Sequence, residues 1–193
     1  MPTDPYVYPD SSCLRNRLGI RDPDALARIE ANQTAIILAQ LARVRLVGRY
    51  DLAHLRAFHR RIFSDIYTWA GELRTVPIAK EQSLFALPEH IEPYLQRVFS
   101  ELAGERFLRE RSHEQFVDRI THYHSELNAV HPFREGNGRT QRAFLAQLAR
   151  DAGYHIAWAR LHADRNVEAS RASLHGDNRL LREMLNELVE PAH

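Results

Sequence analysis

Apolar residues recur at intervals of three and four along most of this 193-residue chain, which is the spacing of one face of an α-helix. Helix start signals precede these repeats. Asp22 and Pro23 stand before a repeat that runs to about Val44, and Asp51 stands before the next one. The pattern predicts an all-α helical bundle, and a chain of this length buries enough surface for a single domain, residues 1–193.

Further helices are predicted from apolar stripes that proline, glycine or capping residues delimit. One helix is expected from Pro88 to Gly104, and the next, which leads to His131, starts at the capping-box pair Ser112 and Gln115. A further helix is expected to end near Gly153, and a short one to cover residues 166–174. Asp177 is the expected cap of the last helix. Residues 1–21, which contain several prolines and tyrosines, are expected to form an ordered arm. Residues 73–87 are expected to form a small two-stranded hairpin, because β-favouring residues stand at positions 75, 76 and 78.

Charge and composition exclude several classes of function. Lysine and arginine number 26 against 25 aspartates and glutamates, and no long block of one sign gives a surface for nucleic acid or membrane. The longest apolar run, residues 34–42, is far shorter than the roughly 20 residues that cross a bilayer. Cys13 is the only cysteine, so an internal disulfide and a thiolate zinc site are excluded. We expect a protein of the cytosol, or a secreted effector if this chain is part of a longer one.

The segment NAVHPFREGNGRTQR, residues 128–142, concentrates reactive and anion-binding groups. Its glycine-rich turn leads into a helix, and the unpaired backbone N–H groups at a helix start bind anions. Gly136 and Gly138 allow a positive φ and a close backbone approach, and Asn137 adds a side-chain donor. Arg139 and Arg142 lie three apart, on one helix face, and two guanidinium groups match a chain of phosphates. The segment therefore predicts a polyphosphate site.

Two further residues of the segment indicate what happens at this site. A carboxylate at Glu135 repels phosphate unless a cation lies between them, and Mg²⁺ typically binds one or two carboxylates together with phosphate oxygens. His131 precedes the loop, with a reference pKa of about 6.5 that suits a general base near neutral pH. The combination indicates transfer of a phosphate-containing group. His122 and His124 are two apart on a helix and face different ways, so packing is the preferred interpretation for them.

The residues HPFREGNGRTQR resemble the signature of Fic-domain proteins, H-P-F-x-[DE]-G-N-G-R-x-x-R, at every specified position. The resemblance extends upstream through residues 66–74, IYTWAGELR, and downstream to SLHGDNRLL. It implies a helical Fic fold with a flap beside the active site. It also implies an enzyme that transfers AMP from ATP to a hydroxyl group of a target protein.

The resemblance assigns a role to each matching residue. It implies His131 as the base, Phe133 as the apolar anchor of the loop, Glu135 as the Mg²⁺ ligand, Gly136, Asn137 and Gly138 as the anion hole, and Arg139 and Arg142 as contacts of the distal phosphates. The flap would bind an extended target segment by strand addition, through Arg74, Thr75, Val76, Pro77, Ile78, Ala79, Lys80 and Phe85. The kinase branch of the family carries lysine at the position of Gly138, so AMP transfer is the expectation here.

Many Fic proteins are silenced by a helix with the motif [ST]-x-x-x-E-[GN], whose glutamate pairs with the last arginine of the signature, here Arg142. No glutamate of this chain has that context. The expectation is therefore a toxin that a separate small helical antitoxin inhibits by carrying this motif. Transfer of UMP or phosphocholine, and removal of AMP, remain open with the same signature. A non-catalytic module that binds a partner when it holds ATP is the alternative of another class, although such a module needs neither base nor metal ligand.

Overall fold

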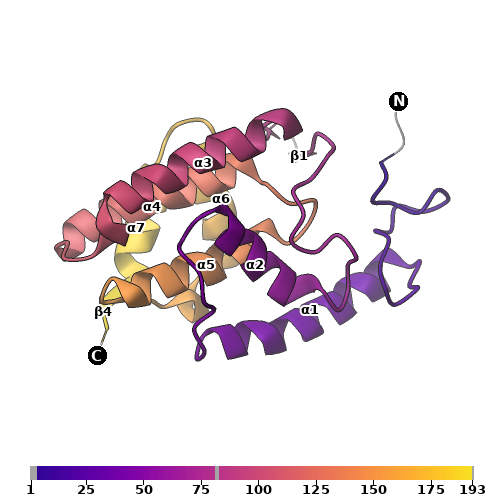
Figure 1. Cartoon of the computed structure of the whole chain (residues 1–193), viewed down its shortest axis with the longest axis horizontal. Coiled ribbons are helices and arrows are strands. Elements are labelled where there is room, and N and C mark those ends of the chain that lie inside the picture. Colours follow the sequence, from indigo (N-terminus) through magenta and orange to yellow (C-terminus); the bar gives the residue numbers. More distant parts are fainter. Residues whose placement is uncertain (1–3, 81–82, 193) are drawn as a thin grey trace.

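A computed structural model of the chain describes residues 4–80 and 83–192 (Figure 1). The prediction of an all-α bundle is confirmed, with seven α-helices in this part of the chain. They are α1 (Pro23–Leu41), α2 (Leu52–Phe63), α3 (Pro88–Gly104), α4 (His113–Val130), α5 (Asn137–Asp151), α6 (Ala163–Leu174) and α7 (Arg179–Leu188), with short 3₁₀ helices at Arg106–Leu108 and Trp158–Arg160. No helix in the described ranges has the length and apolarity that crossing a bilayer requires.

Helix α4 lies at the centre of the bundle, where it packs against α3, α5, α6 and α7 (Figure 1). Its start is fixed by the capping box that the sequence predicts: the Ser112 hydroxyl accepts the Gln115 N–H, and the Gln115 side chain accepts the Ser112 N–H. Helix α5 in turn packs against α2. Apolar side chains from these helices, such as Phe58, Ile120 and Leu145, are fully buried between them. The core therefore holds the end of α4 and the start of α5 beside one another.

Three helix boundaries differ from the prediction. Helix α1 ends at Leu41, because the chain turns away there and leaves Val44 with 66% of its surface exposed. Helix α6 begins at Ala163, three residues earlier than expected. Helix α7 has Asn178 rather than Asp177 at its N-cap, and the Asp177 carboxylate accepts the N–H of Arg179 instead.

The predicted hairpin exists but is shorter than residues 73–87. Strands β1 (Ala79–Lys80) and β2 (Ser83–Leu84) pair antiparallel, with Ala79 opposite Leu84. The β-favouring residues at positions 75, 76 and 78 lie outside both strands, and the backbones of Thr75 and Val76 contact the side chains of Tyr6 and Arg74. Residues 81–82, which join the two strands, lie outside the described residues. A second antiparallel pair, β3 (Tyr154–Ile156) with β4 (Val189–Pro191), was not predicted.

The N-terminal arm, described from Asp4 onward, packs against the base of the flap. The Tyr6 hydroxyl accepts the Thr75 N–H at 3.1 Å, and the Tyr6 ring meets Trp69 edge-on with centroids 5.4 Å apart. The carboxylate of Asp4 accepts two hydrogen bonds from Arg134, at 2.9 and 3.0 Å. The arm thus contacts both the flap and the loop between α4 and α5.

Candidate active site

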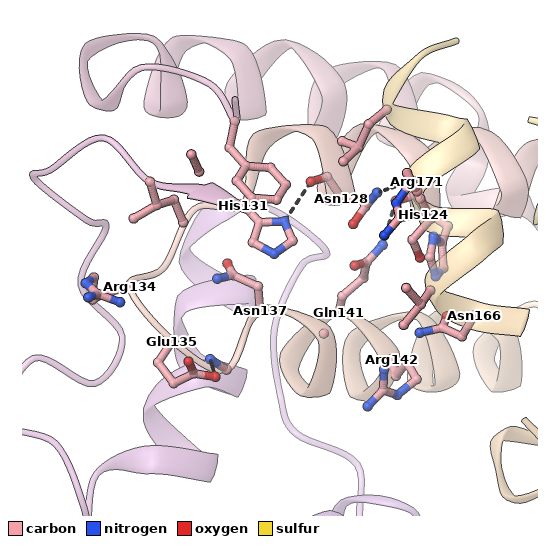
Figure 2. A pocket seen from close by; sticks show the side chains of 18 of the residues that line it. His124, Asn128, His131, Arg134, Glu135, Asn137, Gln141, Arg142, Asn166 and Arg171 are labelled. Carbon is pink, nitrogen blue, oxygen red and sulfur yellow. Dashed lines mark hydrogen bonds between the residues drawn. The ribbon is translucent and has the colours of Figure 1, made fainter. Parts of the chain in front are cut away.

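A cavity of about 630 Å³ opens between the flap, the end of α4, the start of α5 and one face of α6 (Figure 2). Most of the residues that the sequence assigns to the site line it, namely His131, Glu135, Gly136, Asn137, Gly138 and Arg142, together with Pro77, Ile78, Ala79 and Phe85 of the flap. Phe133 and Arg139 are outside this lining. The structure therefore brings the flap, the histidine and the helix start to one cavity.

His131 ends α4 in a left-handed conformation, with φ 45°, and its ring points into the cavity (Figure 2). The ring Nδ1 lies 2.7 Å from the Asn128 carbonyl oxygen. A carbonyl only accepts hydrogen bonds, so Nδ1 is the donor and Nε2 carries the lone pair in the neutral ring. Phe85 of the flap stacks on the ring, with centroids 3.8 Å apart and planes 19° apart. These contacts fix the tautomer and the plane of a proton acceptor.

The loop after His131 is held by the Asn137 side chain. Its Oδ1 accepts the Phe133 N–H at 2.9 Å, and its Nδ2 donates to the Phe133 carbonyl at 2.7 Å. The motif predicted this side chain as a donor in the anion site. Both of its ends are instead used by the loop backbone, so only the backbone N–H of Asn137 is left for a ligand.

The start of α5 is built for an anion. Gly136 is its N-cap, with φ 78°, and as a glycine it supplies no side chain to cap the helix. The first N–H groups of an α-helix have no partner within the helix, and the positive end of the helix dipole lies there. Gly136, Asn137 and Gly138 all line the cavity. An anionic group bound here would lie beside His131.

His59 of α2 packs against the loop, a role that the sequence pattern did not predict. Its ring stacks on Phe133, with centroids 3.9 Å apart, so both rings are buried. Nε2 donates to the Glu135 carbonyl at 2.9 Å, and Nδ1 accepts the Gly71 N–H at 2.7 Å. Its place on the apolar stripe of α2 signalled burial, but both hydrogen-bond partners are backbone groups that sequence spacing does not reveal.

His124 of α4 is buried in the wall of the cavity, whereas His122 is half-buried with Nε2 3.4 Å from the Glu101 carboxylate. These positions agree with the preference for packing over a metal pair. No three histidine, cysteine, aspartate or glutamate side chains of the described ranges form a metal-binding group.

We expect the protein to lose stability as the pH falls from about 6.5 toward 4. Burial lowers the pKa of His59 to about 4 and that of His124 to about 4. In this window the unfolded chain binds protons at both positions and the folded chain does not, so the free energy of unfolding falls as the pH falls. Each pKa difference is worth about 3 kcal/mol when integrated. Urea unfolding of the parent and of His59→Gln across this range measures the effect. An equal slope in the two proteins would contradict the assignment to His59.

Glu135 presents a carboxylate at the cavity, with 42% of its side chain exposed. Oε1 accepts the Gly136 N–H at 2.7 Å and lies 3.3 Å from an Arg139 nitrogen. Oε2 has no hydrogen bond within the described residues. One oxygen is thus held by the protein, and the other is available to a ligand.

The two arginines of the motif have different surroundings, although both were expected to contact phosphates. The Arg142 guanidinium lines the cavity and has no ion pair or hydrogen bond within the described residues; burial lowers its pKa. Arg139 is instead paired with Glu30 of α1 at 2.5 Å. Helix α1 therefore draws Arg139 away from the cavity, a contact that the motif does not reveal.

The flap residue Arg74 is not available to a target segment, contrary to the expectation from the resemblance. Only 2% of it is exposed, and its guanidinium donates to the backbone carbonyls of Val76, Ala86, Val130 and His131. Burial lowers its pKa. Arg74 thus ties the base of the flap to the end of α4. Phe85 is also buried, against His131, whereas Thr75, Pro77 and Ala79 are exposed; the Lys80 side chain lies outside the described residues.

The sequence was compared with models of protein families and with known proteins. The model of the Fic/DOC family matches residues 49–149. "Protein adenylyltransferase VbhT" of Bartonella schoenbuchensis is 43% identical over 178 residues, which cover 92% of this chain and 37% of VbhT. "Probable protein adenylyltransferase Fic" of Salmonella typhimurium is 37% identical over 189 residues, which cover 98% of this chain and 94% of that protein.

Solved structures agree. The N-terminal Fic domain of a VirB-translocated Bep effector protein of Bartonella quintana, determined with bound ADP, superposes with a TM-score of 0.90 at 28% identity and covers 97% of this chain and 95% of that one. The type IV secretion system effector BepA gives a TM-score of 0.89 at 31% identity, covering 96% of this chain and 68% of that one.

Proposed function

This chain belongs to the Fic/DOC family, and from that premise we propose that it is a protein adenylyltransferase, which moves AMP from ATP to a hydroxyl group of a target protein. The observation that carries the proposal is the shared cavity of His131 Nε2 and the uncapped start of α5. A proton acceptor beside an anion site is what transfer to a hydroxyl requires. The relatives named protein adenylyltransferase and the related Fic domain with bound ADP support it.

In the proposed reaction the target hydroxyl gives its proton to Nε2 of His131 while its oxygen attacks the α-phosphorus of ATP. The bond from the α-phosphorus to the bridging oxygen breaks, and pyrophosphate leaves. The N–H groups of Asn137 and Gly138 stabilise negative charge on the α-phosphate, and Arg142 binds the distal phosphates. The Gly136 N–H donates to Glu135, and Gly136 itself lets the chain turn closely around the phosphate. Nδ1–H, held by the Asn128 carbonyl, keeps the imidazolium in place after it accepts the proton.

Mg²⁺ fits the residues present. The described part of the chain has no cluster of three histidine, cysteine, aspartate or glutamate side chains that could hold a metal ion. Mg²⁺, however, commonly binds to one carboxylate and to the phosphates of its substrate. Glu135, with Oε1 held by the Gly136 N–H and Oε2 without a partner in the described structure, is the residue that would hold it. Bound there, Mg²⁺ would neutralise charge on the phosphates.

The flap is the proposed docking site of the target. Strand β1 pairs with β2 on one side, and an extended target segment would add to the hairpin through backbone hydrogen bonds. Phe85, directly after β2, stacks on His131. Pairing at the flap would therefore bring a target hydroxyl into register with Nε2.

The position of the label in ATP tests the proposed transfer. With ATP labelled at the α-phosphate, we expect the label on target protein in a cell lysate, and with ATP labelled at the γ-phosphate we expect none. Mass spectrometry of the product should show an added adenylyl group. Label from the γ-phosphate would indicate a kinase instead, and an adduct of another mass would indicate a different transferred group.

Regulation by a separate antitoxin remains part of the proposal. The Arg142 guanidinium is a half-buried cation without a partner in the described structure. Either a carboxylate or a phosphate would stabilise its charge. A glutamate from the [ST]-x-x-x-E-[GN] helix of a small partner would occupy the place of the terminal phosphate. This arrangement suits a toxin of the bacterial cytoplasm. Exchange of that glutamate for glycine, with the complex still intact, tests it through target labelling.

A further inference from the structure

Glu30 of α1 is a buried carboxylate, 7% exposed, that pairs with Arg139 of α5. Its Oε1 accepts a hydrogen bond from Arg139 at 2.5 Å, and its Oε2 accepts the hydroxyl of Tyr67. Proximity to this carboxylate is one of the causes, after burial, that raise the pKa of Tyr67, which therefore stays a donor. A buried charge with two hydrogen bonds and an arginine partner is held in one place.

Arg139 is held between Glu30 and the active site. The same Nη2 that donates to Glu30 lies 3.3 Å from Oε1 of Glu135. On the other side, Nη1 donates to the Thr34 hydroxyl at 3.2 Å. The guanidinium carbon lies 4.8 Å from the centre of the Phe63 ring. Contacts from α1 and α2 thus fix the guanidinium outside the cavity, with one nitrogen toward Glu135.

The two distances show how the charge of Arg139 is shared. Its nitrogen is 2.5 Å from Glu30 but 3.3 Å from Glu135, so Glu30 holds the stronger of the two contacts. Without the Glu30 charge, the guanidinium would be free to form a close bidentate pair with Glu135. Such a pair would use both carboxylate oxygens and compete with a cation for them.

We propose that Glu30 is a positioning residue for the cation-binding carboxylate. By holding Arg139, it fixes Oε1 of Glu135 and leaves Oε2 and the negative charge of Glu135 available to Mg²⁺. This inference rests on the proposed function, in which Mg²⁺ binds Glu135 together with ATP. Residues that orient a metal ligand commonly affect metal affinity by about 10- to 100-fold.

Binding measurements on the full chain test the inference without any transfer step. Calorimetry would give the affinity for ATP in EDTA and the affinity for Mg²⁺ in the presence of ATP. For Glu30→Gln we expect Mg²⁺ affinity to fall by about 10-fold and ATP affinity in EDTA to stay within about 2-fold of the parent. Glu105→Gln is the matched control, because Glu105 is also a largely buried carboxylate paired with arginines, but it does not line the cavity. It should lose stability and keep both affinities.

A double mutant separates positioning from general damage. If Glu30 acts through Glu135, the effect of Glu30→Gln on Mg²⁺ affinity should disappear in the Glu135→Gln background. An undiminished effect of Glu30→Gln in that background would overturn the inference. An unchanged Mg²⁺ affinity in the Glu30→Gln single mutant would also overturn it, as would a loss of ATP affinity in that mutant that is equal with and without Mg²⁺. Should Glu30→Gln fail to fold, Glu30→Asp keeps the charge but shortens its reach, and the same outcomes apply. Failure of AMP transfer in the parent protein would refute the proposed function separately, since none of these measurements depends on it.

Discussion

Replacing His131 by alanine is expected to abolish AMP transfer and leave ATP binding nearly intact. In the proposed reaction the ring supplies Nε2 as the proton acceptor, oriented by the Asn128 carbonyl and by Phe85, whereas the start of α5 and Arg142 would bind the phosphates. Loss of a general base costs roughly 100- to 10,000-fold in rate. The rate of labelling of a target from α-labelled ATP and the ATP affinity from calorimetry would be measured on the same preparation.

His155→Ala is a suitable control, because His155 is an exposed histidine of β3 that does not line the cavity. It should label targets at the parent rate. If His131→Ala labelled targets as fast as the control, His131 would not be the base. If it instead lost ATP affinity by a factor as large as its loss of rate, the ring would act in nucleotide binding rather than in proton transfer.

The sequence predicted what depends on local spacing. The apolar repeats and the capping box of Ser112 and Gln115 set helix α4 where it is, because these signals act within a few residues. The continuity of the motif brought His131, Glu135 and the glycines to one cavity, because a short loop between two helices leaves them no room to separate. Local chemistry therefore defined both the helices and most of the site.

The sequence did not predict the partners of long side chains. Arg74 reaches carbonyls at Val130 and His131, and Arg139 reaches Glu30, which is more than a hundred residues away in the chain. A long guanidinium binds whichever acceptors the tertiary fold places near it, and spacing along one helix does not reveal them. For the same reason the sequence missed His59, whose partners are backbone groups of two other segments.

Replacing Gly136 by alanine is expected to lower the transfer rate by at least about 100-fold, because displacing reacting groups by about 1 Å costs that much. A Cβ at this position would lie 2.2 Å from Cζ of Phe63 and 2.3 Å from its Cε2. The Phe63 ring has little room to move, since it is fully buried and packed between His59 and the guanidinium of Arg139. The loop must therefore shift, and the N–H groups of α5 shift relative to His131.

Gly153→Ala separates this steric effect from backbone strain. Gly153 has φ 90°, close to the 78° of Gly136, but a Cβ there meets no atom within 4 Å. A left-handed conformation costs an alanine about 1–2 kcal/mol at either position, so both variants should lose similar stability from strain, and Gly136→Ala should lose more from the contact with Phe63. Thermal unfolding and transfer rates, measured side by side, should show a loss of rate in Gly136→Ala alone. Full activity in Gly136→Ala would mean that the loop tolerates the added methyl group. It would also contradict the inference that the rate depends on the position of the α5 N–H groups relative to His131.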